Sequence, residues 1–356
     1  MDTPTPAPIR IGMLFDFPQV DGGESVVAAA RLGLEDATAG GRLDRSIELI
    51  YELANGLPLG TAADIEDHFD ALDDERVLAI IGPSISDNGL IVRELAEGAK
   101  VPCINYTGGA MTRSAWMFHY QVGSLEEEPI ALAEHLATTG AARVGVVFDE
   151  SPVGRRYADS FEAARAGLGL QTTASVGISP VQTQSSDLVE RLRSSNPDAI
   201  AYLGMGLAAR ALAVELKEAE WSVPVVGTSA LMFGYQRKEW RADWEGWVYV
   251  DTLADDNPQR QALRERSRAT AAGPVGVAAY DIGRLLGEGL VRCQHLTRDG
   301  LREGLERVKR LPATSGHAGT TMGFGCWDHG ALKGEYLVLR QWRDGRSVQV
   351  AADVKQ

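Results

Sequence analysis

Two serines follow a strand-to-helix turn in the segment Gly82-Pro83-Ser84-Ile85-Ser86. The residues before the turn, 77–82, are apolar without polar alternation, which is typical of a parallel strand buried on both faces. Hydroxyl groups and free backbone N–H groups at the start of a helix can hold an anionic or carbonyl oxygen. The turn therefore predicts a binding site, and no nucleophile, base or metal ligand accompanies it.

Several kinds of enzyme site come close to a match and fail. The serine turn lacks the closing glycine of a nucleophile elbow and has no histidine partner, which argues against a hydrolase. The segment Gly204-Met205-Gly206-Leu207-Ala208-Ala209 has the spacing of a dinucleotide-binding turn. However, the next strand ends at 226–229 without the acidic residue that would bind the ribose. The 6 histidines do not pair at metal-ligand spacing, so we expect no metal site, no cofactor and no catalytic residues.

A run of three carboxylates, Glu126-Glu127-Glu128, stands immediately before Pro129. Such a run can be a carboxylate cluster with a chemical role. Because proline favours the first turn of a helix and acidic residues stabilise that turn, we expect these residues to start a helix.

Composition narrows the class of protein. The chain has 356 residues, of which 44% are hydrophobic, and this is enough for two domains with substantial cores. Its formal net charge of -14 argues against nucleic acid or an anionic membrane as partner. The 3 cysteines are far apart, so we expect reduced thiols rather than a disulfide framework.

The N-terminal residues 1–8 carry neither the basic region nor the apolar core of a secretion signal. No window approaches the roughly 18 apolar residues that a membrane-spanning helix needs. The sequence as it stands therefore predicts a cytoplasmic protein that does not span a membrane. The alternative is a periplasmic or other extracytoplasmic protein whose leader has been removed.

Strands and helices alternate along most of the chain, which indicates doubly wound parallel sheets. The first series is followed by a second one of the same plan, and no sequence repeat relates them, so we predict two lobes. A third part changes from helices to strands and is expected to cross between the lobes. The expected strands lie at 9–15, 47–53, 77–82 and 101–106, then at 144–148, 172–176, 199–203 and 223–227, and finally at 322–327, 336–341 and 348–351. The expected helices lie at 24–38, 61–72 and 89–98, then at 154–166, 186–193 and 207–220, and finally at 258–272, 275–294 and 298–310.

Four groups of residues are unspecific when taken singly, but their order and spacing along the chain carry a resemblance to a known family. They are Ile11-Gly12-Met13-Leu14 with the helix through Ala28-Ala29-Ala30-Arg31-Leu32-Gly33, the paired strand ends Ile80-Ile81-Gly82-Pro83-Ser84 and Val101-Pro102-Cys103-Ile104-Asn105, the helical segment Ala279-Tyr280-Asp281-Ile282, and the final stretch Gly319-Thr320-Thr321-Met322-Gly323-Phe324, Trp327-Asp328-His329-Gly330 and Tyr336-Leu337-Val338. Together they resemble the type I periplasmic solute-binding proteins, in the branch named for branched-chain amino acids, which includes amide and urea binders. The resemblance covers the chain from about Ile9 to Val350.

The resemblance implies an α/β fold of two doubly wound parallel-sheet lobes joined by a hinge of three crossovers. The crossovers are expected near 121–125, 249–253 and 323–327. Lobe 1 would then comprise 9–121 plus 253–323, and lobe 2 would comprise 122–250 plus 324–352. The ligand is expected in the cleft, with a hinge movement that closes the lobes over it.

Ligands of open α/β sheets bind beyond the carboxyl ends of the strands, so the strand pattern and the family resemblance predict the same loops. By position, the turns 84–86 and 107–109 would hold a ligand carboxylate or carbonyl through hydroxyl and N–H groups. Ordinary helix capping by serine and threonine is the alternative, and both roles are compatible. The predicted ligand-binding residues are Gln19, Ser84, Ile85, Ser86, Tyr106, Thr107, Gly108 and Gly109 in lobe 1, and Val153, Gly206 and Ser229 in lobe 2.

Two departures from the family pattern bear on the ligand. Ser229 takes the place of the acidic residue that binds the ammonium group in amino-acid binders, and serine cannot neutralise a cation. Val153 stands where the family has an aromatic residue before a glycine. Apolar residues near the same loops would be either core or an apolar wall; they are Met205, Leu207, Leu231, Met232 and Phe233. We therefore expect a ligand with a carboxylate, carbonyl or amide group rather than a free amino acid.

Two function classes remain open. The first is a non-catalytic receptor that delivers a small organic ligand to an ABC permease. The second is a cytosolic ligand sensor of the same fold that regulates a partner protein. Neighbouring permease and ATPase genes would favour the first, and a regulator or catabolic operon would favour the second.

Overall fold

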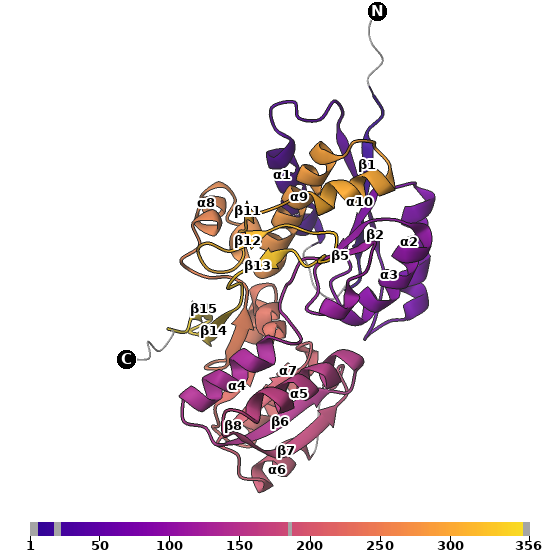
Figure 1. The fold of residues 1–356 in the computed structure, drawn as a ribbon. Helices are drawn as coiled ribbons and strands as arrows, with labels where there is room; N and C mark the ends of the chain where they lie inside the picture. Colours follow the sequence, from indigo (N-terminus) through magenta and orange to yellow (C-terminus); the bar gives the residue numbers. More distant parts are fainter. Residues whose placement is uncertain (1–5, 18–22, 184–186, 352–356) are drawn as a thin grey trace, which may run out of the picture. The chain divides into compact units, whose positions relative to one another are not determined.

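The computed structural model describes residues 6–17, 23–183 and 187–351 of the chain. They form two compact units: unit 1 is Met1–Val122 with Asp256–Tyr336, and unit 2 is Gly123–Asp255 with Leu337–Gln356. The chain thus passes between the units three times. Each unit contains a parallel sheet with helices (Figure 1), which confirms the predicted α/β class with two parallel-sheet lobes.

The sheet of unit 1 has five strands in the order β2-β1-β3-β4-β5, all parallel. Its strands β3 and β4 are wholly buried, and β3 is also wholly apolar, as its lack of polar alternation predicted. The strand β5 was not expected, because it has only three residues and no flanking pattern of its own. The strands are β1 (Ile9–Phe15), β2 (Ile47–Leu53), β3 (Ala79–Ile81), β4 (Cys103–Asn105) and β5 (Met117–His119).

Helices pack in pairs in unit 1 (Figure 1). Helix α1 (Gly23–Thr38) lies against α9 (Pro274–Arg292), and α2 (Ala62–Asp74) lies against α3 (Ser86–Ala99). Glycines allow the first pair to approach closely: a Cβ at Gly33 would lie 2.0 Å from the carbonyl oxygen of Tyr280. Two of the sequence segments that carried the family resemblance therefore meet at one helix interface. Two shorter helices, α8 (Pro258–Arg266) and α10 (Arg298–Glu306), complete this part of the unit.

The sheet of unit 2 has seven strands in the order β15-β14-β10-β9-β8-β6-β7. Its first five strands in the chain are parallel, and β14 and β15 add to them as antiparallel strands. The strands are β6 (Arg143–Asp149), β7 (Gln171–Ile178), β8 (Ala199–Leu203), β9 (Val225–Gly227), β10 (Val248–Asp251), β14 (Val338–Arg343) and β15 (Arg346–Gln349).

The helices of unit 2 also pack in pairs. Helix α4 (Glu128–Thr138) packs against α5 (Pro152–Arg165), and α6 (Leu188–Ser194) packs against α7 (Leu207–Glu218). Helix α5 starts at Pro152, two residues before the expected start at 154: the Ser151 side chain accepts a hydrogen bond from the Gly154 N–H, and Pro152 occupies the first turn.

The third passage between the units lies later than expected, at 336/337 instead of 323–327. The strand expected at 322–327 is only β12 (Thr321–Met322), which pairs with β11 (Leu311–Pro312) and β13 (Leu332–Lys333). The segment after β12 stays with unit 1 because its backbone pairs with β5: the His119 N–H donates to the His329 carbonyl over 2.8 Å. The ring of Phe324 also packs edge-on against Phe118 at 4.8 Å.

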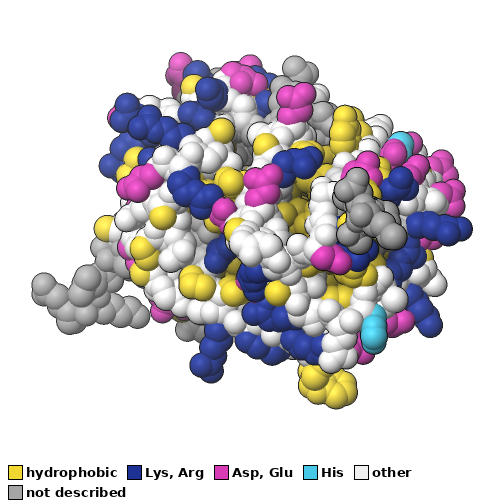
Figure 2. Space-filling view, turned by 90° about the horizontal axis from the view of Figure 1, so that it is seen from above, with side chains coloured by type: hydrophobic (Ala, Val, Ile, Leu, Met, Phe, Trp, Pro, Cys, Tyr) yellow, Lys and Arg dark blue, Asp and Glu magenta, His cyan; other side chains and the backbone are white. Residues whose placement is uncertain are grey.

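The surface of the described chain mixes charges of both signs. On the face seen in Figure 2, lysine and arginine side chains alternate with aspartate and glutamate, and apolar side chains lie between them. Within the described residues, no helix combines the length and the apolar character that crossing a membrane requires.

Candidate ligand-binding loops

The strand order places one pair of loops at a special position in each unit. In the order β2-β1-β3, the connections of β1 and β3 leave in opposite directions, and the loops after these strands flank a crevice. Unit 2 repeats this arrangement with β7-β6-β8. The loops after β1 and β3, and those after β6 and β8, are therefore the positions at which each unit is best built to meet a ligand.

In unit 1, Asp16 directly follows β1 and lies across this switch point from the serine turn. Its carboxylate accepts hydrogen bonds from the Ser84 N–H at 2.8 Å, the Ser84 hydroxyl at 2.7 Å and the Ile85 N–H at 2.9 Å. The side-chain amide of Asn88 donates a fourth bond at 2.9 Å. Asp16 is only 1% exposed, and this burial raises the pKa of its carboxyl above the ordinary value, although the four hydrogen bonds act in the opposite direction.

The serine turn thus holds an oxygen anion, as its residues predicted, but the anion belongs to the protein. The donors expected to bind a ligand carboxylate or carbonyl, the hydroxyl of Ser84 and the N–H groups of Ser84 and Ile85, are engaged by Asp16. Ser86 starts α3 and is buried. These residues lie after the end of β3, and the donors of Ser84 and Ile85 point into unit 1.

The second predicted turn of unit 1 is also bonded internally. The Thr107 hydroxyl donates to Oδ1 of Asn105 at 3.0 Å and accepts from the Gly109 N–H at 3.2 Å. Tyr106 is buried, and both this burial and the charge of Asp16 raise the pKa of its hydroxyl. The structure therefore brings Asp16, the Ser84 turn and Tyr106 together. In the neighbouring turn, Gly108 is partly exposed and Gly109 is buried. Gln19, which was also predicted to bind the ligand, lies outside the described residues.

Unit 2 repeats the motif of unit 1 at its own switch point. Asp149, the last residue of β6, is fully buried and accepts the Met205 N–H at 2.8 Å and the Tyr202 hydroxyl at 2.8 Å. The Gly206 N–H donates to the same Tyr202 hydroxyl at 3.2 Å. Gly206 has a φ of 96°, so the turn needs glycine there. The turn that resembled a dinucleotide-binding loop is thus closed by a carboxylate of the protein.

A second buried carboxylate in unit 2 holds the loop after β9. Oε2 of Glu128 accepts the Ser229 N–H at 2.7 Å, and Oε1 accepts the Ser229 hydroxyl at 2.8 Å. The Ser124 N–H, at 2.7 Å, and the Tyr157 hydroxyl, at 3.1 Å, also donate to Oε1. Glu128 is fully buried, and this burial raises its pKa to about 7 against the hydrogen bonds, which lower it.

Glu128 corrects one part of the sequence interpretation. The acidic run does start a helix, as expected, because Glu128 is the first residue of α4 and Pro129 lies in its first turn. Its side chain, however, turns into the unit instead of facing solvent. The carboxyl group that the Ser229 position lacks in its own loop is therefore supplied from α4, where it accepts the Ser229 hydroxyl.

The remaining predicted residues of unit 2 lie in the same region. Val153 is buried in the first turn of α5, the helix that also carries Tyr157. A Cβ at Gly206 would lie 2.8 Å from the carbonyl oxygen of Ala230 and 3.1 Å from the ring of Phe233, both in the segment after β9. Of the apolar residues expected to be core or wall, Leu231 and Phe233 are buried, whereas three remain partly exposed: Met205, Leu207 and Met232.

Sequence reasoning missed Asp16, Asp149, Tyr157 and the role of Glu128. For the two aspartates a signal was present, because each stands at the end of the strand that begins a sheet. Glu128 and Tyr157 gave none, since an acidic residue before proline and a tyrosine in a helix are ordinary features. Among the described residues, no group of histidine, cysteine, aspartate or glutamate side chains has the arrangement of a metal site.

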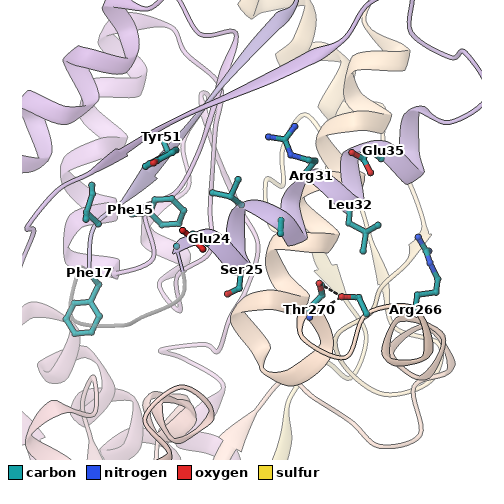
Figure 3. Close-up of a pocket in the computed structure, with 15 residues that line it drawn as sticks. Phe15, Phe17, Glu24, Ser25, Arg31, Leu32, Glu35, Tyr51, Arg266 and Thr270 are labelled. Atoms are coloured by element: carbon teal, nitrogen blue, oxygen red, sulfur yellow. Dashed lines mark hydrogen bonds between the residues drawn. The ribbon is translucent and has the colours of Figure 1, made fainter.

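A cavity of about 1100 Å³ lies elsewhere in unit 1, along α1. The rings of Phe15, Phe17 and Tyr51 lie on one side of α1, and Arg266 and Thr270 lie on the other (Figure 3). None of the described residues that were predicted to bind ligand lines it. The cavity therefore shares Phe17 with the loop after β1, but no residue of the serine turn or of the turn 107–109 lines it.

Comparison with known proteins agrees with this architecture. The family model of the periplasmic binding proteins matches residues 8–346. Among solved structures, the type 1 periplasmic binding protein of Bordetella pertussis is 19% identical with a TM-score of 0.81, covering 97% of this chain and 100% of that one. A leucine binding protein of Thermotoga maritima is 18% identical with a TM-score of 0.81, and the match covers 96% of this chain and 98% of that one.

A third similar structure is an ABC transporter substrate-binding protein of Desulfitobacterium hafniense in complex with Leu. It is 17% identical with a TM-score of 0.79, covering 97% of this chain and 100% of that one. No sequence among the curated proteins matches the chain. Since the family model spans nearly the whole chain and both units have the sheet order and strand-end loops described above, the chain belongs to the type I periplasmic binding protein family.

Proposed function

We propose that this chain is the solute receptor of an ABC importer, a non-catalytic protein that closes over a small organic solute and delivers it to a permease. The observation that carries the proposal is the family match over residues 8–346. The similar structures include an ABC transporter substrate-binding protein in complex with Leu and a leucine binding protein. Such a receptor works outside the cytoplasmic membrane, which is the second of the two compartments expected from the sequence.

The geometry bears on the solute within the expected classes. A carboxylate or a carbonyl would need hydrogen-bond donors from the serine turn, and in the structure the Ser84 hydroxyl and the N–H groups of Ser84 and Ile85 are bonded to Asp16. An amide also carries N–H groups, which can donate to the protein. Of the three expected groups, the amide is therefore the one that the loops support best.

The experiment has two stages. Native mass spectrometry of the purified protein first detects a retained solute, and a thermal-shift screen of amino acids, amides, amines and carboxylates follows. A solute that binds only the folded protein stabilises it by about 2.7 kcal/mol at a concentration of about 100 Kd. We expect at least one solute to raise the melting temperature in a concentration-dependent way.

The transport role needs a second readout. If permease and ATPase genes neighbour this gene, their products are expressed and reconstituted in liposomes with the receptor. We expect the solute-loaded receptor to stimulate ATP hydrolysis and solute uptake. Binding without any such stimulation would contradict the importer role, and fractionation of cells that express the complete gene tests the compartment.

A further inference from the structure

Strand β2 forms one edge of the unit 1 sheet, and its outer side is unpaired among the described residues. The Ser46 carbonyl accepts a hydrogen bond from the N–H of Ile9 at 2.9 Å, and the Ala54 N–H donates to the carbonyl of Phe15 at 2.8 Å. The even-numbered residues of this stretch therefore direct their backbone groups toward β1. Because these groups alternate between the two sides of a strand, the odd-numbered residues direct theirs outward. The outward residues are Ile47, Leu49, Tyr51 and Leu53, and no described residue bonds to their N–H or C=O groups.

The other edges of the two large sheets are covered, short or irregular. At β5, the His119 N–H donates to the His329 carbonyl and the Ala331 N–H donates to the His119 carbonyl, each over 2.8 Å. In unit 2, β15 has only 4 residues, and the register of β7 with β6 shifts between Thr172 and Ala174. Proteins protect sheet edges in these ways because a free edge pairs readily with another chain. Strand β2 has 7 residues without a proline, a lysine or a register shift, so it lacks these protections.

The free edge of β2 also carries an apolar surface. Tyr51 is 64% exposed and Leu53 is 54% exposed, and among the large apolar side chains of the described residues only Trp327 is more exposed. The ring of Phe15 stands edge-on to Tyr51, with 6.5 Å between the ring centroids, and both line the cavity along α1 (Figure 3). Unpaired backbone groups and exposed apolar side chains on one strand are typical of an interaction site.

Two free charges on α1 indicate what kind of partner fits this surface. Arg31 and Glu35 line the same cavity as Tyr51 and are exposed (Figure 3). Neither of them forms an ion pair with another described residue. Because the two charges have opposite signs, the surface is complementary to itself: a two-fold axis can bring the arginine of one copy to the glutamate of the other. A partner with charges of one sign would leave one of the two unmatched.

We propose that β2 is a self-association edge, at which two copies of this chain pair so that their unit 1 sheets become one continuous sheet. A two-fold axis through the shared sheet makes the two β2 strands antiparallel. The outward N–H and C=O groups of each copy then bond to the same groups of the other. This pairing goes beyond the receptor function, and it does not depend on which solute is bound.

The side chains of β2 restrict the register of the pairing. Residues that direct their backbone groups outward must face each other, so the axis passes through one residue position. An axis at position 48, 50 or 52 sets two glutamates, from Glu48 and Glu52, directly opposite each other, which is unfavourable. An axis at Leu49 sets the apolar Leu53 opposite the charged Arg45.

An axis at Tyr51 avoids both conflicts. It sets Tyr51 opposite Tyr51 of the second copy and Leu53 opposite Leu49. The two most exposed side chains of β2 are then covered by apolar side chains, and such cross-strand pairs stabilise a sheet. This register is therefore the one that we expect.

The first test is the mass of the full chain by sedimentation between about 1 and about 100 µM. We expect a concentration-dependent rise from 38.3 kDa to twice that mass. The test variant Tyr51→Lys/Leu53→Lys puts two charges on the edge, and the matched control Ile130→Lys/Val348→Lys changes two exposed apolar residues of unit 2. We expect the Kd of the dimer to rise about tenfold or more in the test variant and to stay unchanged in the control.

The second test is the register, by disulfide crosslinking in a Cys326→Ser background, which removes the exposed cysteine. Facing residues of antiparallel strands have Cα atoms about 5.5 Å apart, within reach of a disulfide. Tyr51→Cys is therefore expected to give a crosslinked dimer on mild oxidation. Leu53→Cys is expected to give none, because the two copies of residue 53 would lie about 13 Å apart.

Each test has an outcome that overturns the proposal. A protein that stays monomeric up to about 100 µM overturns it, and binding of an added extended peptide to β2 would then assign the edge to a different partner. A dimer that the two lysines on β2 do not weaken also overturns it, because another surface must form the interface. Crosslinking through residue 53 but not through residue 51 contradicts the register. Thermal unfolding at low concentration checks that the lysine variant is folded, and we expect the melting temperature of the wild type, because the outward groups have no partner within the unit.

Discussion

Replacing Glu128 by glutamine is expected to change how the stability of unit 2 depends on pH. The carboxyl has an ordinary pKa of 4.5, and in the folded protein burial raises this value to about 7. Since the folded protein binds this proton more tightly than the unfolded chain, the contribution is fully present below pH 4.5. It is lost as the pH rises through about 7.

The magnitude follows from the two pKa values. A shift of about 2.5 units corresponds to about 3.4 kcal/mol, because one pKa unit is about 1.36 kcal/mol. Most of this, about 2.5 kcal/mol, is lost between about pH 5 and about pH 8. Glutamine does not titrate, and its amide would face the Ser229 N–H that now donates to Oε2. We therefore expect the variant to be destabilised by about 1–3 kcal/mol at low pH and to lose this disadvantage as the pH rises.

The assay is urea unfolding, measured at about pH 5 and at about pH 8 and followed by tryptophan fluorescence. Unit 2 contains Trp221, Trp240, Trp244, Trp247 and Trp342, so the signal reports mainly on the unit that contains Glu128. The matched control is Glu126→Gln, which removes the same charge from a partly exposed residue paired with Arg156. If the difference between wild type and the Glu128 variant is the same at both pH values, burial does not raise this pKa and the reasoning is refuted.

Three further predictions concern packing and chemistry. Gly33→Ala is expected to destabilise the protein by about 1–3 kcal/mol in urea unfolding, because its Cβ would collide with a carbonyl oxygen of α9. The control is Gly98→Ala, whose Cβ meets no atom within 4 Å and which should be neutral or slightly stabilising. Equal effects of the two substitutions would refute the close approach of α1 and α9. Asp281→Asn is expected to lower the melting temperature markedly and to lower the free energy of unfolding by about 3–5 kcal/mol. The reason is that this fully buried carboxylate accepts hydrogen bonds from Tyr120, Thr314 and Arg284 in unit 1. An unchanged melting temperature would count against this cluster. Cys103, whose burial raises the pKa of its thiol, is expected to resist iodoacetamide in the native protein while exposed Cys326 reacts, as mass spectrometry of the labelled peptides would show; rapid labelling of both would contradict the burial.

Much of the fold could be predicted from local pattern. The apolar run of β3 and the alternation of strands and helices required parallel sheets covered by helices, and the structure has them. Residues 324–336 could not be assigned in this way. Their membership of unit 1 depends on backbone bonds to β5, a strand of three residues whose own sequence carries no periodic signal.

The candidate site shows the same division. The serine turn after β3 was predicted to hold an anionic or carbonyl oxygen of a ligand, because its residue types and its place before a helix favour that role. Which anion it holds depends on residues far away in the chain: Asp16 lies 68 residues from Ser84, and Glu128 lies 101 residues from Ser229. No local pattern encodes such a distance.

The sequence by itself determined the class of the fold, the position of the candidate loops at the strand ends and the absence of the familiar enzyme motifs. Hydrophobic periodicity and turn chemistry act over a few residues, so they are visible in the letters. Only the tertiary structure decided the direction of the hydrogen bonds at those loops. It turned Ser84 and Ser229 from donors into acceptors, because the sheet order brings Asp16 to Ser84, helix α4 brings Glu128 to Ser229, and a hydroxyl has only one proton to donate.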